Sequence, residues 1–365
     1  MRSGSVRFEG RLGLQQRVLP SYRAAFLERL AAACTGGLSV FAGGPRPIES
    51  IAAAEGLQGA EWVRGKNRHW FSGPIYLCSQ PGLDAWLETA GLDALVLEAN
   101  PRYLSNWRAR RWAHAHGVPV VGWGLGAPAV PWLWAEWRRR YLAGFDALIA
   151  YSTLGAEQYR QAGFPPERVA VAVNASRSAP TGQVVAAEGD GPLRVLFVGR
   201  LQARKRVDLL IEACAAAQTP VTLTVVGDGP VRSNLESIAR HRLPGTSFLG
   251  HLEGAPLENA YRRADLLVLP GTGGLAVQEA MAHQLPVVVG EGDGSQADMV
   301  RPENGWLMRK IDVESLRGIL ELAASDRGRL TRMGAESLRI VCDEVNIDRM
   351  VEVFVQVLNG LKGSG

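Results

Sequence analysis

Cysteine is scarce in this sequence and widely spaced. The four residues Cys34, Cys78, Cys214 and Cys342 never form a C-x-x-C pair. Zinc sites and disulfide frameworks need closely grouped cysteines, so neither is indicated, and free thiols are expected. The chain also lacks a run of about 18 apolar residues, and its first segment lacks the apolar core of a signal peptide. We therefore expect a cytoplasmic protein without a membrane-spanning helix.

The composition excludes wholesale disorder and fibrous repeats. Of the 365 residues, 47% are hydrophobic and 21% are charged, which is ordinary globular usage. No tandem repeat of about 20 to 50 residues is visible. At roughly 150 residues per domain, this length predicts about two domains, each able to bury its own core.

The net charge of +4 is unevenly distributed along the chain. Residues 1–192 contain 20 lysines and arginines against 15 acidic residues, whereas residues 193–365 contain 20 against 21. The first half also holds nine of the ten tryptophans, and several of them alternate with arginines in residues 106–112 and 131–141. That mixture suits an anionic or amphiphilic surface. Alternatively, the tryptophans fill the core while the arginines remain solvated at its rim.

Apolar strands alternate with amphipathic helices in the second half of the chain. Strands are expected at residues 193–199, 221–227, 247–250, 265–270 and 286–290, and helices at 207–217, 231–241, 257–264 and 275–284. Near-continuous apolar strands separated by helices indicate a parallel sheet that is covered on both faces.

The first half shows the same alternation more faintly. Strands are expected at Leu38–Ala42, Ala94–Glu98, Pro119–Trp123 and Ala147–Tyr151, and helices at Ser21–Ala33 and Leu104–His116. The fold class predicted for the whole chain is therefore α/β, with two Rossmann-like, doubly wound domains.

Residues 175–192 form the clearest aperiodic stretch and are expected to link the two domains. The first domain is assigned to residues 1–174 and the second to residues 193–345. A last helix, at about Ile347–Leu361 within residues 346–365, is expected to pack back on the first domain.

The loop after the strand at 193–199 contains the first candidate site residues. In doubly wound sheets, ligands bind beyond the carboxyl ends of the strands. Gly199 lets a ligand approach the backbone, and Arg200 and Lys205 can converge on the two phosphates of a diphosphate. Alternatively, these basic side chains are simply solvated in an ordinary loop.

Glycines also follow two further strands. Gly227 and Gly229 flank an aspartate before a helix, which is equally typical of a simple turn. Leu249 and Gly250 end a short strand, where main-chain groups can contact a nucleobase. Ordinary core packing would explain that strand equally well.

The loop before the helix at 275–284 contains Gly271, Gly273 and Gly274. They expose backbone N–H groups at a helix N-terminus, where the helix dipole favours an anion. Glu279 lies about one turn into this otherwise apolar helix. A buried carboxylate needs a partner, and a ribose diol offers two hydroxyl donors. An exposed helix glutamate is the alternative.

Taken in order, these segments resemble the donor-binding domain of retaining GT-B glycosyltransferases of the family-4 group. The resemblance rests on GRLQARK (199–205), VVGDGP (225–230), FLGH (248–251) and PGTGGLAVQEAMAHQLPVVV (270–289). It implies two domains facing a central cleft, and transfer of a sugar from a nucleotide diphosphate sugar. That donor is a substrate, and no cofactor is implied. No Asp-x-Asp follows a strand, which agrees with metal independence.

The resemblance assigns a role to each matching residue. Arg200 and Lys205 match the pair that holds the donor diphosphate and stabilises it as a leaving group, and they are the expected catalytic residues. Glu279 matches the second glutamate of an E-x7-E motif, which holds the ribose. The backbone of Gly274 and Leu275 matches the segment that approaches the phosphates and the donor sugar. The expected donor site is completed by Gly199, Gly227, Gly229, Leu249, Gly250, Gly271 and Gly273.

Two positions depart from the pattern of the family. Gly271 replaces the first glutamate of the E-x7-E motif, and Leu125 replaces the histidine of a W-G-H-G stretch. Both family residues lie near the transferred sugar. A GT-B protein that binds a nucleotide sugar with little or no transferase activity is therefore the alternative function.

The acceptor, a glycan or a lipid-linked saccharide, is expected to bind mainly to the first domain. Residues 15–33 look like the first loop and helix of one subgroup. The candidate acceptor contacts are His69, Asn100, Trp123 and Gly124, although His69 is equally typical of a structural histidine. A second hypothesis is peripheral docking on anionic lipid at the inner face of a membrane through Arg108, Arg110, Arg111 and Arg138–Arg140, and its alternative is that these arginines are only solvated.

Other classes of function fit less well. The positive charge is not accompanied by a helix-turn-helix, zinc-finger or RNP-type pattern, so nucleic-acid binding is not expected. An epimerase or a phosphorylase on the same fold remains an alternative, but a phosphorylase would need a cofactor lysine that the sequence does not suggest. His114 and His116 are expected near a helix C-terminus, and His283 on a helix surface.

Overall fold

The structure is a computed structural model that describes residues 7–49, 51–71, 73–180, 191–271, 274–290, 292 and 294–362. The chain divides into two compact units, Met1–Ser176 with Ile347–Gly365, and Arg177–Asn346. Within the described ranges, no helix is both long and apolar enough to cross a membrane.

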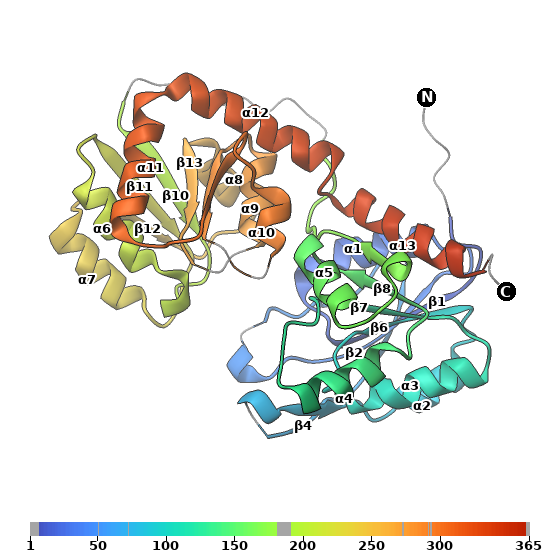
Figure 1. Cartoon of the computed structure of the whole chain (residues 1–365). Coiled ribbons are helices and arrows are strands. Elements are labelled where there is room, and N and C mark those ends of the chain that lie inside the picture. The colour runs from blue at the N-terminus through green and yellow to red at the C-terminus, as the bar shows by residue number, and fades with distance from the viewer. Residues whose placement is uncertain are drawn as a thin grey trace, which may run out of the picture. The chain divides into compact units, whose positions relative to one another are not determined.

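A parallel sheet forms the centre of the first unit (Figure 1). Its strands are β1 (Leu12–Val18), β2 (Leu38–Gly43), β3 (Glu61–Arg64), β6 (Ala94–Glu98), β7 (Val120–Gly124), β8 (Ala147–Ala150) and β9 (Val169–Val171). Their spatial order is β3-β2-β1-β6-β7-β8-β9. The order reverses between β1 and β6, and this reversal is the point at which doubly wound sheets bind their ligands.

Helices cover both faces of this sheet. They are α1 (Ala24–Ala32), α2 (Leu83–Thr89), α3 (Leu104–Ala115), α4 (Trp132–Leu142), α5 (Thr153–Gln161) and α13 (Ile347–Lys362), with short 3-10 helices η1 (Ser21–Arg23), η2 (Pro47–Glu49), η3 (Gly73–Ile75) and η4 (Pro166–Arg168). Side chains of α1 and α13 share one core cluster, whereas those of α2, α3, α4 and α5 share the other. A hairpin of β4 (Arg68–Trp70) and β5 (Leu77–Ser79) lies outside the main sheet.

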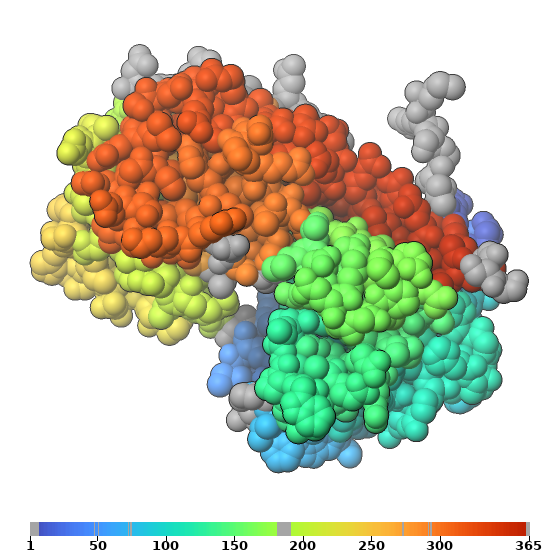
Figure 2. All heavy atoms as spheres, viewed as in Figure 1, coloured from blue at the N-terminus to red at the C-terminus, as the bar shows by residue number. Residues whose placement is uncertain are grey.

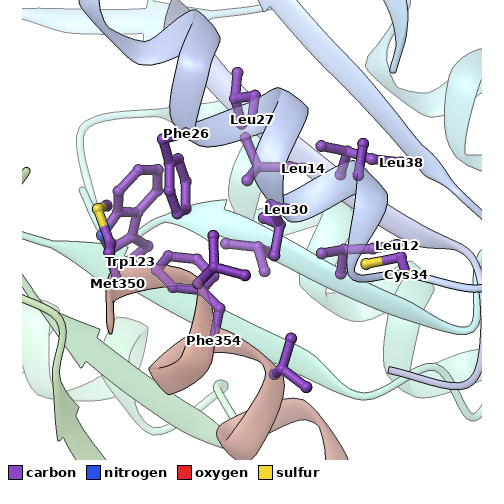
Figure 3. Close-up of a cluster of buried hydrophobic side chains, with 14 of the residues drawn as sticks. Leu12, Leu14, Phe26, Leu27, Leu30, Cys34, Leu38, Trp123, Met350 and Phe354 are labelled. Carbon is purple, nitrogen blue, oxygen red and sulfur yellow. The ribbon is translucent and has the colours of Figure 1, made fainter. Parts of the chain in front are cut away.

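The last helix, α13, belongs to the core of the first unit. Phe354 of α13 has no exposed surface, and its ring lies 5.1 Å from Phe26 of α1 and 5.0 Å from Trp123 of β7, as measured between ring centroids (Figure 3). At the helix start, Asp348 accepts a 2.6 Å hydrogen bond from Arg29. The chain therefore returns to the first unit after completing the second.

The second unit repeats the doubly wound plan. Its strands are β10 (Leu193–Val198), β11 (Val221–Val226), β12 (Ser247–Gly250), β13 (Leu266–Leu269), β14 (Val287–Gly290) and β15 (Gly305–Met308). They are all parallel, in the order β12-β11-β10-β13-β14-β15. The helices are η5 (Ala203–Lys205), α6 (Val207–Ala216), α7 (Arg232–Arg242), α8 (Gly254–Arg262), α9 (Leu275–Ala282), α10 (Ser295–Met299), α11 (Val313–Ser325) and α12 (Arg327–Asp343).

The two doubly wound α/β domains are thus confirmed, and the central cleft stays a prediction. Some details differ from the sequence expectations. Residues 15–18 belong to strand β1 rather than to a loop. Ala175 is fully buried in the core of the first unit, so the expected linker does not begin there. Residues 181–190 of that linker lie outside the described ranges. The four cysteines are free thiols, as expected.

Candidate functional site

The carboxyl ends of β10, β11 and β12 are joined by direct backbone contacts. The N–H of Gly199 donates to the carbonyl of Val226 at 3.0 Å, and the N–H of Gly227 donates to that of Gly250 at 2.7 Å. Gly227 has φ +128°, and a Cβ there would lie 2.0 Å from the carbonyl oxygen of Gly199. Only glycine fits this close approach, so these loops form one surface at the edge of the sheet.

Gly271 lies directly against the loop that carries Lys205. Its N–H donates to the carbonyl of Lys205 at 3.1 Å. A Cβ at position 271 would lie 2.1 Å from the carbonyl oxygen of Arg204 and 2.6 Å from the Cα of Lys205. A glutamate at this position would therefore displace the backbone of the lysine loop. The glycine that departs from the E-x7-E motif thus permits this close contact between the two loops.

Lys205 ends η5 and is half-buried. Burial lowers its pKa, and the neighbouring charge of Arg204 lowers it further. The next residue, Arg206, has φ 53° and ψ 40°, a left-handed conformation that is uncommon for a residue with a side chain. This conformation turns the chain from η5 into α6. Arg200 is exposed in the same loop.

Glu279 lies on α9 with its side chain 26% exposed. Its Oε2 accepts a 2.6 Å hydrogen bond from Nη1 of Arg177. Burial raises the pKa of the Glu279 carboxyl, although Arg177 and His283 act in the opposite direction. Gly274 precedes the first residue of α9, Leu275.

The remaining donor-site candidates lie at the same edge of the sheet. The side chain of Leu249 is 47% exposed near the end of β12. A Cβ on Gly229 would lie 2.2 Å from the carbonyl oxygen of Leu201, which again places two loops in contact. Gly273 lies outside the residues that the structure describes. Two cations therefore follow β10, and the N-terminus of α9 and its carboxylate follow β13, an arrangement that suits a phosphorylated ligand.

On the first unit, His69 of β4 is paired with a tyrosine. Its Nδ1 lies 2.9 Å from the hydroxyl of Tyr76, and the two rings stack at 5.6 Å. Burial lowers the pKa of His69, and the charges of Arg17 and Arg46 lower it further, whereas Glu49 acts in the opposite direction. Asn100 lies in the loop after β6, and its side-chain oxygen accepts a 3.1 Å hydrogen bond from the backbone N–H of Arg102.

Trp123 does not line an acceptor surface, contrary to the expectation. Its side chain is 1% exposed and packs against Phe26 and Phe354 in the core (Figure 3). The alternation of side chains along β7 turns this indole toward α1 and α13. Gly124, the next residue, is half-buried, and a Cβ there would lie 2.7 Å from the hydroxyl of Tyr159.

Sequence reasoning missed a polar cluster at the carboxyl ends of β1 and β6. Gln15 is fully buried, donates to Gln80 and accepts a 2.9 Å hydrogen bond from Asn106. Glu98 accepts the backbone N–H of Arg17 at 2.7 Å, and burial raises the pKa of this carboxyl to about 7. The run of polar residues inside strand β1 was the one available signal, because buried polar groups require partners.

The arginines of α3 differ in their environments. Arg110 is 5% exposed, donates to the carbonyl of Tyr141 and lies 4.3 Å from the centre of that ring. Arg110 is therefore too buried to dock on a lipid surface, contrary to that hypothesis. Arg108 is exposed and pairs with Asp84 at 3.0 Å.

The other histidines of interest are held by main-chain oxygens. His114 and His116 lie at the end of α3, as expected, and contact the carbonyls of Gly144 and Trp112 at 3.1 and 2.8 Å. His283 is 8% exposed and stacks on a tyrosine ring, so the expectation of a surface residue is wrong. Within the described ranges, no group of three or more His, Cys, Asp and Glu is placed to hold a metal ion.

Two Rossmann-like units in one chain, the second with a glycine-rich and cationic edge, match the two-domain architecture of the GT-B class of protein. Two family models match the chain. "Glycosyl transferase 4-like domain" matches residues 13–175, and "Glycosyl transferases group 1" matches residues 192–325. The chain therefore belongs to the family-4 group of GT-B glycosyltransferases.

Named relatives agree with this membership. An uncharacterised glycosyltransferase of Methanocaldococcus jannaschii is 31% identical over 46% of this chain and 45% of its own length. The putative colanic acid biosynthesis glycosyltransferase WcaL of Salmonella typhimurium is 27% identical over 72% of this chain and 68% of its own length. The chain thus spans less than half the length of the first of these two relatives.

A solved structure agrees in fold across almost the whole chain. HepE of Anabaena, solved in complex with UDP, has a TM-score of 0.72 at 16% identity. The match covers 96% of this chain and 99% of that chain. At this identity the likeness establishes the fold.

Proposed function

We propose that this protein transfers a sugar from a nucleotide diphosphate sugar to a saccharide acceptor, with retention of anomeric configuration and without a metal ion. The observation that carries the proposal is the contact of Gly271 with the Lys205 loop. This contact joins the loop of Arg200 and Lys205 to the loop that leads into α9. Membership of the family supports the proposal, as does the structural neighbour solved with UDP.

The main barrier in such a transfer is departure of the nucleoside diphosphate, because negative charge grows on the leaving phosphate. Arg200 and Lys205 would stabilise that charge as cations, and the N–H groups at the start of α9 would add their dipoles. The half-buried position of Lys205 strengthens its electrostatic effect relative to bulk water. A bound diphosphate would also favour the charged form of this lysine and offset the lowering of its pKa.

Glu279 would bind the nucleotide through the ribose, whose two hydroxyls can donate to a carboxylate. The donor sugar would meet the main chain near Gly271, because no side chain fits at that position. The alternative of a binding protein without transferase activity predicts the same nucleotide site. It differs in predicting no donor turnover across a panel of acceptors.

Nucleotide binding is tested by a thermal-shift screen with UDP, GDP, dTDP, ADP and their common sugar conjugates, without added metal. A ligand at 100 times its Kd should stabilise the fold by about 2.7 kcal/mol. We expect a shift with one nucleotide class, and we expect Glu279→Ala to abolish it.

Glu212→Ala is the matched control. It removes a glutamate of α6 that pairs with Arg242 at 2.7 Å, away from the edge of the sheet. The nucleotide shift should persist in this variant. If no nucleotide shifts the wild-type protein, the donor site is wrong.

The proposed acceptor is a lipid-linked saccharide. The first unit, which would bind it, would also make peripheral contact with an anionic membrane. Trp132, Leu133 and Trp134 at the start of α4 are 75%, 63% and 55% exposed. This helix lies in the green segment on the face of the first unit that Figure 2 turns toward the viewer. Adjacent exposed apolar side chains mark surfaces that meet another molecule, and tryptophan favours membrane interfaces. Arg139 and Arg140 of the same helix are exposed and share Glu136 as a partner.

Membrane contact is tested by sedimentation with vesicles of phosphatidylglycerol or of phosphatidylcholine. The wild type should sediment with the anionic vesicles, because α4 combines apolar side chains with three arginines and one glutamate. Replacing Trp132, Leu133 and Trp134 together with alanine should weaken binding by about tenfold or more, because apolar area no longer enters the interface. Leu154→Ala, at an exposed leucine of α5, is the control. Equal sedimentation with both lipids would contradict anionic docking.

A further inference from the structure

Arg177 holds the carboxylate of Glu279 in the second unit. It is the first residue of that unit, and 102 positions separate it from Glu279. Its Nη1 donates to Glu279 Oε2 at 2.6 Å, and the two side chains are 35% and 26% exposed. Charge-assisted hydrogen bonds of this kind are stronger than neutral ones, and partial burial reduces their screening by water. The orientation of Glu279 is therefore tied to Arg177.

Three other titratable groups face Glu279. His283 follows it by one turn, and its Nδ1 lies 2.8 Å from the main-chain oxygen of Glu279 rather than from the carboxylate. The ring of His283 stacks on that of Tyr261, which is buried on α8. Glu258, also on α8, raises the pKa of Glu279, as burial does. Among the groups that oppose burial, Arg177 has the largest effect on this pKa.

We propose that Arg177 is a positioning residue for nucleotide recognition, which holds Oε2 of Glu279 so that the carboxylate presents its remaining lone pairs to a ribose diol. The inference rests on the proposed function, in which Glu279 binds the ribose. An ionised carboxylate has about four lone-pair sites, so it can accept from an arginine and from two hydroxyls at once. Without Arg177, the carboxylate loses its fixed orientation and takes up a proton at a higher pH.

The test uses the full chain with Arg177→Ala and Arg177→Lys. The probe is whichever of UDP, GDP and ADP gives the largest thermal shift, together with its 2′-deoxy form. Calorimetry measures both dissociation constants between pH 5.5 and pH 8. In Arg177→Ala we expect the ribonucleotide to bind about tenfold more weakly at pH 7, because one charge-assisted hydrogen bond that orders the site is gone. The affinity for the 2′-deoxy form should fall by less, so the ratio of the two dissociation constants should move closer to one.

The pH profile separates positioning from a loss of packing. Nucleotide binding by the wild type should weaken as Glu279 takes up a proton at low pH. Arg177 lowers the pKa of Glu279, so its removal should move this loss of binding to higher pH. Arg177→Lys keeps the charge but not the planar fork, and it should recover part of the affinity and most of the pH profile.

Arg242→Ala is the matched control, because it removes another arginine–glutamate pair of the same unit, between α7 and α6. It should leave affinity, ribose preference and pH profile unchanged. If Arg177→Ala also leaves the affinity, the ribose preference and the pH profile unchanged, the inference is wrong, although the nucleotide site remains supported. Tighter binding would also overturn it, since Arg177 would then compete with the ribose.

Two further outcomes separate this inference from the proposed function. If the wild type binds dTDP but none of the three ribonucleotides, the donor site stands and ribose recognition by this pair fails. If the wild type binds none of the four nucleotides, the proposed function fails, and the inference fails with it. Should Arg177→Ala not fold, Arg177→Lys and Arg177→Gln give the same readouts.

Discussion

Lys205→Ala is expected to lower kcat for sugar transfer by about 100- to 1000-fold, the effect of removing one preorganised group that stabilises a developing negative charge. The lysine is half-buried, and its loop is held by the N–H of Gly271 and by the left-handed turn at Arg206. The charge of Lys205 is thus already held in position before the nucleoside diphosphate departs. The effect should fall on kcat, because the charge that it stabilises is largest in the transition state.

The measurement is donor turnover with the nucleotide sugar that the thermal-shift screen selects. Lys310→Ala is the matched control, because Lys310 is 82% exposed and pairs with Asp312 at 2.6 Å in the same unit. Its turnover should equal that of the wild type. Glu279 remains in Lys205→Ala, so nucleotide binding should be weakened rather than lost. Wild-type turnover in Lys205→Ala would exclude this lysine as the stabiliser of the leaving group.

The second unit could be predicted from its sequence because its central strands are largely buried. Leu266–Leu269 and Val287–Gly290 are buried throughout, and Leu193–Val198 is apolar except for Arg194. Such runs are typical of parallel strands between two layers of helices. The expected strands accordingly exceed β10 and β11 by one residue at the carboxyl end, and β13 by one residue at each end. The loops that follow these strands, and their candidate residues, were located by the same pattern.

Strand β1 could not be predicted in the same way. Its second half contains Gln15, Gln16 and Arg17, which interrupt the apolar pattern although both glutamines are buried. Gln15 is tolerated because it finds partners on distant segments, such as Gln80, 65 positions away. A pattern read along the chain contains no information about such partners.

The interactions around the candidate donor site were hidden for the same reason. The sequence showed that position 271 lacks a glutamate, but it did not show that Gly271 lies against the backbone at Arg204 and Lys205. The partner of Glu279 is Arg177, which lies in a stretch that the sequence assigned to a linker. Residue type and order predicted the candidate site, whereas the contacts among its residues required the fold.

Phe354→Ala is expected to lower the free energy of unfolding of the first unit by about 3–5 kcal/mol, the usual cost of removing a buried phenylalanine side chain. The ring has no exposed surface and contacts Phe26 and Trp123, so its loss leaves a cavity between α13, α1 and the sheet. Tryptophan fluorescence during urea unfolding reports mainly on this unit, because Trp306 is the one tryptophan of the chain that lies in the second unit.

Two variants of the same helix make the result specific. Gln356→Ala changes an exposed residue of α13 and should alter the free energy of unfolding by about 0.5 kcal/mol or less. Phe354→Leu keeps the site apolar and retains much of the volume, so its cost should be well below that of alanine. A Phe354→Ala protein within about 1 kcal/mol of the wild type would contradict this packing. Since Phe354 and Glu279 belong to different units, nucleotide binding should survive in the folded fraction of the variant.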